Sequence, residues 1–336
     1  MSRKPASRPG FDRVPALIAR RTLMAAAGAA VLPGRRAMAR RFISMITGAA
    51  AGSNGDEIAH LFGRHFGKVL AGTEVLVRNV PGDGGRTALN ALADAPPSAA
   101  TVGWVVTPVL SARIVDRNDP DLSSRLRLLG AVQREPIAFV ASADDPLDSV
   151  RDILQRASQD SSTFPLGTPP PGSPPHLAAI RLQNITQTRL NIIAFPTAAA
   201  ARQALLGGHV SAAALGLSDV IAALRDDKLV GLGITARRRS GILPDLPILA
   251  EAGVSLSAWI RRGLAVPAGT DPGLFEPLTI ALKTVAEDPG FREQSETLGL
   301  IAAWSDGIAW TAQVEREREE LAALWAADPW LNASGQ

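Results

Sequence analysis

Short apolar runs alternate with stretches of helical periodicity along most of the chain. Residues 42–47 predict a buried strand, and residues 56–70 carry apolar side chains at the three- and four-residue spacing of an amphipathic helix. A second strand is predicted at 75–80, a helix from about Thr87, and a third strand at 101–106. This alternation suits parallel βαβ units and predicts an α/β fold.

The alternation continues through the rest of the chain. Residues 126–140 form strand-like runs that Glu135-Pro136 interrupts, and everything between 266 and Trp325 is predicted to be helical. The remaining predicted strands lie at 190–195, 210–215, 229–235 and 263–266, and the remaining helices lie at 146–156, from His176 onward, and at 197–206.

The length allows two lobes. A chain of 336 residues with 46% apolar and 20% charged residues has the size and balance of a folded protein with two α/β lobes. We expect the chain to cross between the lobes near Ala141 and again near Ser257. This assigns 42–141 together with 258–336 to the first lobe, and 142–257 to the second.

The first 39 residues carry the features of an export signal. Arg20-Arg21 is followed by a free position and two apolar residues, which is similar to a twin-arginine motif. The apolar run 23–32 is shorter than the roughly 20 residues that span a bilayer, and Ala37-Met38-Ala39 fits a signal-peptidase site. We predict a signal peptide at 1–39 and a periplasmic location; the alternative is a basic tail with a chance apolar stretch.

The basic balance of the chain comes from this segment. The sequence pI is about 9.9, but the first 39 residues hold eight of the 35 Lys and Arg residues and one of the 32 Asp and Glu residues. The remainder therefore carries a net charge of −4. A stripe of positive charge for nucleic acid is not expected there, so nucleic acid is not a predicted partner.

Motifs of catalysis are incomplete. The absence of cysteine excludes disulfides, thiolate metal sites and cysteine nucleophiles. Residues 63–68 resemble a P-loop but are one residue short, with Val69 in place of Ser or Thr, and 216–220 lack the closing glycine of a nucleophile elbow. The four histidines lack zincin spacing: His60, His65, His176 and His209. We predict a binding protein with no metal or cofactor.

The first candidate binding loop precedes the helix at 56–70. Ser53 can cap this helix, with Asp56 completing a capping box, and Gly52 and Gly55 allow a ligand to approach the backbone closely. Free amides at 53–55, beside Asn54, would attract an anion. Asp56 would repel a carboxylate, so we expect it to organise the loop; the alternative is a capped helix without a ligand.

The second candidate loop runs from Thr168 to His176. Ser173 is a good N-cap, Pro174 suits the first helical position, and three consecutive prolines stiffen the loop. Hydroxyls of Thr168 and Ser173 and amides at 172–174 would face the ligand, so that no Arg or Lys is required. His176 would hydrogen-bond across the loop, in a ligand-contacting or a purely structural role.

Several longer motifs occur in a specific order. They are Gly52 with Asp56, Asn79-Val80-Pro81-Gly82-Asp83-Gly84-Gly85, Gly172-Ser173 with His176-Leu177-Ala178, Leu205-Leu206-Gly207-Gly208, Leu243-Pro244-Asp245-Leu246-Pro247 with Glu251-Ala252-Gly253, and Pro267-Ala268-Gly269-Thr270. On these motifs the chain resembles the Bug-type (TctC-like) substrate-binding proteins of tripartite tricarboxylate transporters, over roughly Arg41 to Trp325.

This resemblance implies a periplasmic, two-lobed type II (Venus-flytrap) fold with a ligand cleft between the lobes. It implies a small carboxylate as ligand, held by amides, hydroxyls and water, and a membrane permease as partner. We expect a monomer. The expected substrate-binding residues are Gly52, Ser53, Asn54, Asp56, Thr107, Thr168, Gly172, Ser173, His176 and Thr197.

Four departures from the family pattern weaken the transfer of ligand identity. Ser53 replaces a loop glycine, Ser98-Ala99-Ala100 replaces Asp-Gly-Tyr, Thr197 replaces a tyrosine and Ser211 replaces an aspartate. A differently shaped pocket is expected. Two other functions remain open, a ligand-sensing subunit of a signalling system and an enzyme on the same scaffold, since fold does not fix function.

Overall fold

The computed structural model describes residues 41–331 apart from 71–72, 98–99, 161 and 163. The predicted signal peptide at 1–39 lies outside the described residues. Within the described part, no helix combines the length and the hydropathy that crossing a bilayer requires.

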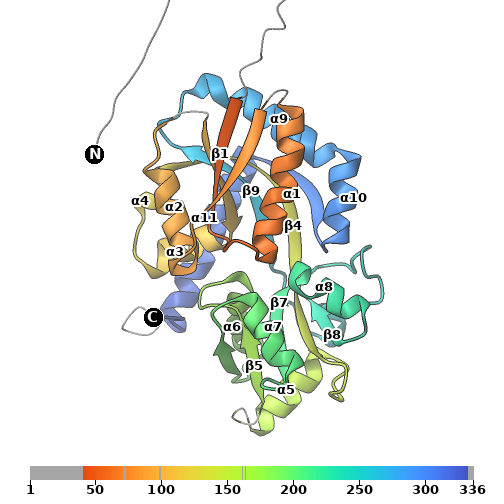
Figure 1. Cartoon of the computed structure of the whole chain (residues 1–336). Coiled ribbons are helices and arrows are strands. Elements are labelled where there is room, and N and C mark those ends of the chain that lie inside the picture. Colours follow the sequence, from red (N-terminus) through yellow and green to blue (C-terminus); the bar gives the residue numbers. More distant parts are fainter. Residues whose placement is uncertain (1–40, 71–72, 98–99, 161, 163, 332–336) are drawn as a thin grey trace, which may run out of the picture. The chain divides into compact units, whose positions relative to one another are not determined.

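The first sheet is built around parallel strands near the start of the chain (Figure 1). Its strand order is β2-β1-β3-β9-β4, and β10 pairs with β4 on the far side. β1 is parallel to β2 and β3, whereas β9 and β10 run antiparallel to their neighbours. The strands are β1 (Arg41–Thr47), β2 (Thr73–Asn79), β3 (Thr101–Thr107), β4 (Leu126–Ser142), β9 (Trp259–Pro267) and β10 (Ile301–Asp306).

The second sheet contains the other end of β4. β5 is parallel to β6 and β7, and β4 lies antiparallel between β7 and β8. The strands are β5 (Pro165–Thr168), β6 (Asn191–Ala194), β7 (Ala212–Gly216) and β8 (Leu229–Ile234).

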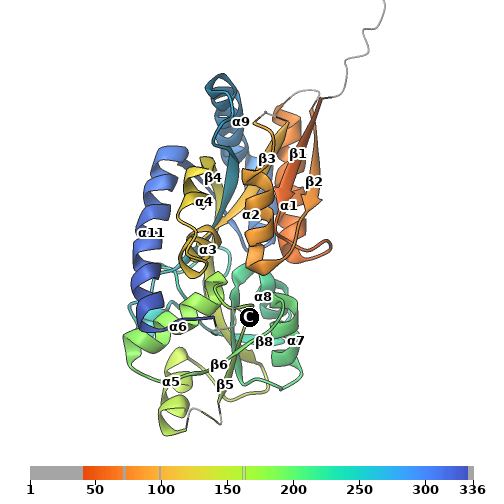
Figure 2. The same ribbon diagram turned by 90° about the vertical axis from the view of Figure 1, so that its left-hand side faces the viewer.

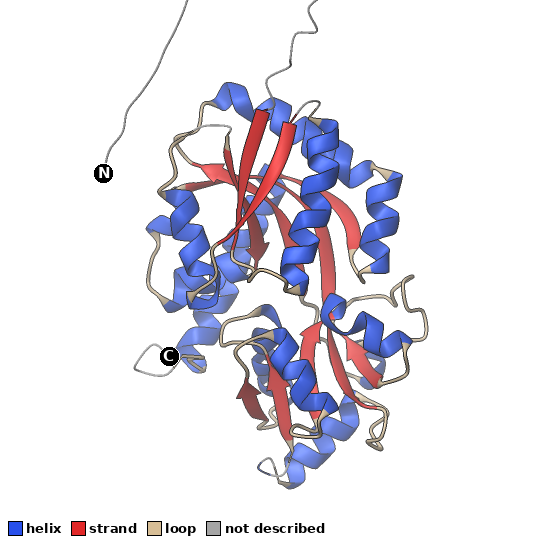
Figure 3. Ribbon diagram, viewed as in Figure 1, coloured by secondary structure: helices blue, strands red, loops and turns tan. Residues whose placement is uncertain are grey.

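Helices cover both faces of each sheet (Figure 3). Those beside the first sheet are α1 (Asn54–Val69), α2 (Arg86–Ala93), α3 (Val109–Asp116), α4 (Asp121–Ser124), α9 (Phe275–Glu287), α10 (Pro289–Thr297) and α11 (Gly307–Ala327). Those beside the second are α5 (Val150–Gln159), α6 (Pro174–Thr186), α7 (Ala198–Leu206) and α8 (Leu217–Arg225). Short 3₁₀ turns are η1 (Asp83–Gly85), η3 (Leu249–Ala252) and η4 (Pro272–Leu274).

Aromatic packing fixes α1 on the first sheet. Phe62 is fully buried and stacks on Trp104 of β3, with 4.5 Å between ring centroids, and Phe66 and Phe291 extend the cluster. The apolar residues predicted at helical spacing therefore form the core-facing side of α1. Because that side is fixed, the N-terminus of α1 is held at the edge of the sheet where β1 and β3 end.

β4 is shared by the two sheets. Residues 126–136 pair with β9, and 137–142 pair with β7 and β8. The predicted interruption at Glu135-Pro136 is wrong, because β4 runs through it: Pro136 lies at the point where β4 changes partner, and the Ile137 amide donates to Thr235 Oγ1 over 2.9 Å. We call β4 and β9 the hinge strands. The predicted lobe boundaries of 42–141, 142–257 and 258–336 stay a prediction.

The predicted all-helical end of the chain is also wrong, because β10 lies between α10 and α11. Ile301-Ala302-Ala303-Trp304 has no strong strand signal of its own, and it pairs antiparallel with β4 with one irregularity. Its conformation follows from the tertiary pairing.

α11 connects the two halves of the fold. It lies beside α3 (Figure 2), and its last turns pack through the buried Leu321 against Leu177 and Ile180 of α6. Trp330, just after α11, belongs to the same apolar cluster. Residues 321–331 thus cover a junction between elements of both sheets.

Gly263 allows the hinge strands to approach each other. A Cβ on Gly263 would lie 2.1 Å from the carbonyl oxygen of Gly130 in β4, and that backbone cannot move aside without breaking the sheet. We expect Gly263→Ala to lower the free energy of unfolding by about 2–4 kcal/mol in urea denaturation. Gly241→Ala, where a Cβ meets nothing within 4 Å, is the control and should stay within about 0.5 kcal/mol. Equal stability of the two variants would contradict this interpretation.

Candidate ligand-binding site

The first loop is ordered by its own side chains. Ser53 caps α1 and accepts from the Asp56 amide over 3.3 Å. Asp56 does not close the predicted capping box; its carboxylate accepts from the Gly52 amide (2.9 Å) and from Asn79 Nδ2 (2.7 Å). Burial works to raise the pKa of Asp56, but these hydrogen bonds outweigh it and lower that pKa. Asp56 is therefore an ionised organiser of the loop.

Two amides at the start of α1 remain available. The Ser53 amide donates to Ala50 O over 3.1 Å. Within the described residues, the amides of Asn54 and Gly55 have no acceptor, as expected for the first turn of a helix. The predicted donors at 53–55 are thus reduced to two.

A small cavity lies beside Gly55, the second of these two residues. Its volume is about 220 Å³, and Gly55 is part of its wall. The rest of the wall comes mainly from the ends of β1 and β3 and from η1 and α2, and most of it is apolar. The polar groups in its lining are the side chains of Thr47 and Arg262 and the indole N–H of Trp104, which is buried without a partner among the described residues. Gly48, Gly84 and Gly85 bring backbone close to the space.

Arg262 of β9 is the cation in this wall. Its side chain is 9% exposed, and Nη2 pairs with Oε1 of the fully buried Glu135 on β4. Nη1 is buried and has no hydrogen-bond partner in the described part of the chain. Arg262 is not among the residues predicted from the sequence, although a charged pair, Arg261-Arg262, at the start of an apolar strand is an unusual signal.

The first loop also contacts the second sheet's helices. Asn54 Nδ2 donates to Ser218 Oγ (2.8 Å) and Asp219 Oδ1 (3.0 Å) at the start of α8. The Ser218 amide donates to Glu135 Oε2 over 2.7 Å. Ser218 and Asp219, noted in the sequence only as part of an incomplete nucleophile elbow, are therefore contact residues between the two halves.

Asp219 has an unusual protonation equilibrium. Burial, followed by the nearby charge of Glu135, raises the pKa of Asp219 from 3.8 to about 6, although the hydrogen bond from Asn54 opposes this change. Asp219 therefore titrates near pH 6, where the contact with Asn54 is made by a partly protonated carboxyl group.

The second loop does not offer the expected row of amides. The Ser173 amide donates to Pro170 O (3.0 Å), the Gly172 amide lies 3.5 Å from His176 Nδ1, and Pro174 has no N–H. The prediction of free donors at 172–174 is wrong because the proline-rich turn uses them internally. Ser173 Oγ is buried and makes no hydrogen bond with a described residue.

A buried arginine from the first sheet's helices supports this loop. Arg113 of α3 donates to Pro171 O over 3.1 Å and pairs with Asp116 over 2.6 Å. A Cβ on Gly172, where φ is +73°, would lie 1.7 Å from Arg113 Nη2. Burial first, and then the Arg113 charge, lower the pKa of His176 to about 4, so His176 is neutral near pH 7.

The three predicted threonine hydroxyls are already engaged. Thr107 Oγ1 accepts from Trp310 Nε1 (3.2 Å), Thr168 Oγ1 donates to Pro169 O (3.0 Å), and Thr197 caps α7 by accepting from the Ala200 amide (3.0 Å). Thr107 and Thr168 are buried, and Thr197 is exposed. None of them lines the small cavity.

The site has no metal-binding group among the residues that the structure describes: no three His, Asp or Glu side chains lie together in a way that could hold an ion. Its chemistry is that of an arginine and free backbone amides, which are donors for an anion.

Sequence comparison identifies relatives along most of the chain. The family described as "Tripartite tricarboxylate transporter family receptor" matches residues 60–313. A UPF0065 protein of Agrobacterium vitis is 25% identical over 290 residues, covering 84% of this chain and 82% of the relative. A UPF0065 protein of Cupriavidus necator is 27% identical over 276 residues, covering 80% and 83%.

Solved structures share the fold. The periplasmic binding protein BugD has a TM-score of 0.76 at 23% identity, covering 85% of this chain and 97% of its own. A TctC solute-binding protein from Polaromonas has a TM-score of 0.67 at 25% identity, covering 86% and 99%. MatC of Rhodopseudomonas palustris, solved with bound malate, has a TM-score of 0.74 at 21% identity, covering 84% and 98%.

These similarities confirm the predicted two-lobed α/β fold of periplasmic binding proteins and the resemblance found in the sequence. The members of this group are solute receptors rather than enzymes. Because the family match covers well over half of its residues, this chain belongs to the tripartite tricarboxylate transporter receptor family.

Proposed function

We propose that this protein is a periplasmic receptor that captures a small carboxylate in the cavity beside Arg262 and delivers it to a membrane permease. The observation that carries the proposal is the buried Nη1 of Arg262, which has no partner among the described residues and belongs to a side chain in the cavity wall. A buried N–H without an acceptor costs about 1–3 kcal/mol, and a carboxylate oxygen would supply that acceptor.

The surroundings of Arg262 suit a carboxylate. The free amides of Asn54 and Gly55 lie at the N-terminus of α1, where the helix dipole favours negative charge. A bond from a guanidinium to a carboxylate is roughly twice as strong as one between neutral groups. The volume of about 220 Å³ is below the range of about 300–1,000 Å³ typical of drug-sized ligands, which favours a small metabolite.

Related structures support the same ligand class. MatC of R. palustris was solved with malate, and another R. palustris protein of this fold, with a TM-score of 0.79 at 19% identity, was solved with adipate. Both ligands are dicarboxylates. We therefore propose a di- or tricarboxylate for this chain, with one carboxylate at Arg262.

The second half of the fold would complete the site on closure. Asn54 contacts Ser218 and Asp219, so the first loop would donate hydrogen bonds to the ligand and also joins the two lobes. Of the predicted second-lobe residues, Ser173 has a free buried hydroxyl to offer, while Gly172 and His176 shape its loop. Closure excludes water and strengthens the bonds to the ligand.

Export and assembly follow the family. The twin-arginine-like signal at 1–39 would deliver the folded chain to the periplasm, and the permease would be its partner there. A monomeric receptor stays part of the proposal.

Replacing Arg262 tests the site. Arg262→Lys keeps a positive charge for Glu135 but loses the second N–H arm, so affinity for the bound carboxylate should fall about tenfold to hundredfold, the equivalent of one charged hydrogen bond. Isothermal titration calorimetry against a panel of di- and tricarboxylates measures this. Arg261→Lys is the matched control, because its side chain pairs with Glu317 on the opposite face of the same strand. Equal affinities of the two variants would exclude Arg262 as the anchor.

The raised pKa of Asp219 predicts that the stability of the protein depends on pH. Because its folded-state pKa is raised to about 6, the folded protein retains a proton that the unfolded chain has lost between about pH 4 and 6. The stabilisation of the folded state by this bound proton is greatest at low pH and is lost as the pH rises through 6. Asp219→Asn should remove this dependence and raise the free energy of unfolding at pH 7.5 by about 1–2 kcal/mol.

Urea denaturation at pH 4.5, 6 and 7.5 measures the Asp219 effect. The control is Asp227→Asn, at an exposed position with φ +54°, which asparagine tolerates. The same pH profile in wild type and Asp219→Asn would show that Asp219 does not titrate in this range.

A further inference from the structure

The hinge strands present two chemically different faces. Arg134 of β4 lies directly opposite Arg261 of β9, and Gln133 lies opposite Arg262. Because side chains alternate along a strand, Arg134 and Arg261 share one face and Arg262 points to the other. The face of Arg262 belongs to the carboxylate cavity, so the face of Arg134 and Arg261 is separate from the proposed site.

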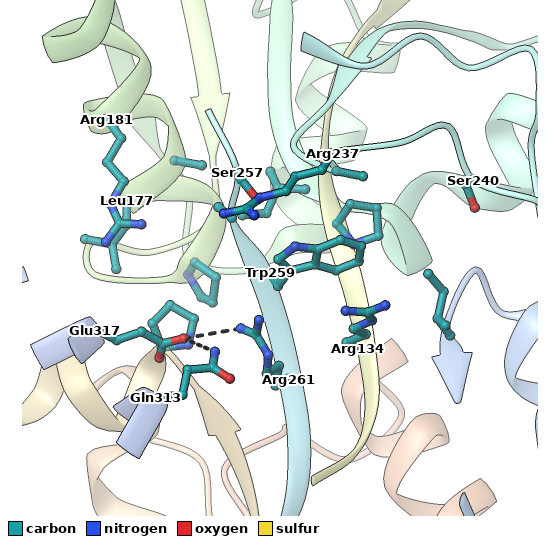
Figure 4. A pocket seen from close by; sticks show the side chains of 18 of the residues that line it. Arg134, Leu177, Arg181, Arg237, Ser240, Ser257, Trp259, Arg261, Gln313 and Glu317 are labelled. Atoms are coloured by element: carbon teal, nitrogen blue, oxygen red, sulfur yellow. Dashed lines mark hydrogen bonds and ion pairs between the residues drawn. The ribbon is translucent and has the colours of Figure 1, made fainter. Parts of the chain in front are cut away.

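A large pocket opens on this second face (Figure 4). Its volume is about 840 Å³, and both halves of the fold contribute to it. Trp259 and Arg134 lie on the hinge strands, Arg181 comes from α6, and Arg237 comes from the segment after β8. We call it the arginine pocket. Its arginines are Arg134, Arg181, Arg237, Arg238, Arg239, Arg261 and Arg316.

Acidic residues balance only part of this charge. The two in the lining are both used: Glu317 pairs with Arg261 over 3.3 Å and Glu320 pairs with Arg181 over 3.1 Å. Arg239 pairs with Glu251 outside the pocket. The other four arginines have no ion pair or hydrogen bond from their guanidinium to any described residue; they are Arg134, Arg237, Arg238 and Arg316.

The arrangement combines a fixed floor with an exposed rim. Arg134 is half-buried and stacks over the Trp259 ring, with 4.5 Å from its Cζ to the ring centroid, and its Nε is buried without a partner. Arg237, Arg238 and Arg316 are exposed. Burial lowers the pKa of Arg261, and the neighbouring charges of Arg134 and Arg316 lower it further despite Glu317. Positive charge is therefore concentrated beyond what the local acids neutralise.

We propose that the arginine pocket is a second anion site that binds a small multivalent oxyanion bearing several phosphate or carboxylate groups. Guanidinium groups form paired hydrogen bonds with both kinds of group, and four of them without acids in one pocket match a ligand with several charges rather than one. The pocket has nearly four times the volume of the carboxylate cavity, about 840 Å³ against 220 Å³.

The position of the pocket gives the bound anion a mechanical consequence. Arg134 and Arg316 belong to β4 and α11 beside the first sheet, whereas Arg237 and Arg238 belong to the second half of the fold. An anion held between them favours the arrangement of the two halves in which these four charges are close together, since without it they repel each other.

The test compares anions of increasing charge on the full chain. Calorimetric titration with inorganic phosphate, pyrophosphate, tripolyphosphate and citrate should show affinity that rises with the number of charges and falls with added salt. Tripolyphosphate and citrate distinguish phosphate from carboxylate ligands. Arg237→Gln combined with Arg238→Gln should weaken binding of the tightest-bound anion about tenfold. Arg134→Gln should weaken it by a similar factor, and the bound anion should then no longer quench the fluorescence of Trp259.

The control variant removes two exposed arginines elsewhere, Arg64→Gln with Arg292→Gln on α1 and α10. It should retain affinity within about twofold. Arg262→Lys should leave the binding of tripolyphosphate unchanged, which separates the arginine pocket from the carboxylate cavity. Absence of saturable binding by all four anions, or pocket variants that bind them as strongly as the control variant does, would overturn the proposal.

Discussion

The pair formed by Glu135 and Arg262 joins the two hinge strands to the second half of the fold. Glu135 is fully buried on β4, and it accepts from Arg262 on β9 and from the first-turn amide of Ser218. A buried carboxylate is tolerated only when its oxygens are satisfied, so these donors hold β9 and α8 in position around it. The first loop, whose Gly55 lines the proposed carboxylate cavity, then reaches α8 through Asn54.

The alternation of side chains on the same strands divides the hinge into two surfaces. Arg262 faces the small cavity, and its Nη1 has no hydrogen-bond partner among the described residues, while Arg134 and Arg261 face the larger pocket. A ligand on either face therefore acts on the same two strands. The close packing at Gly263 against Gly130 holds these two strands together between the two surfaces.

Only the first loop of the candidate site could be predicted from local sequence, because the cavity wall and Arg262 depend on contacts between distant residues. The loop at Gly52–Asp56 was predictable because a glycine, an N-cap and a helix follow one another within a few positions, and Asp56 organises that loop as expected. Arg262, Ser218 and Asp219 were missed because their roles need partners at Glu135 and Asn54, far away along the chain. The second loop was predicted at the right place, but its amides turn inward because Pro170 supplies an acceptor and Pro174 removes a donor.

By itself the sequence determined the α/β class, the parallel βαβ order of both halves, the capped helix start at Asn54 and the family likeness. These features rest on periodicity and on motifs of a few residues, where neighbours in sequence are neighbours in space. Only the tertiary structure decided that β4 passes unbroken through Pro136, that β10 is a strand, and that an arginine rather than a row of second-lobe amides lines the small cavity. Each of these depends on strand pairing or on a buried charge finding its partner, and such energies arise only when distant segments meet.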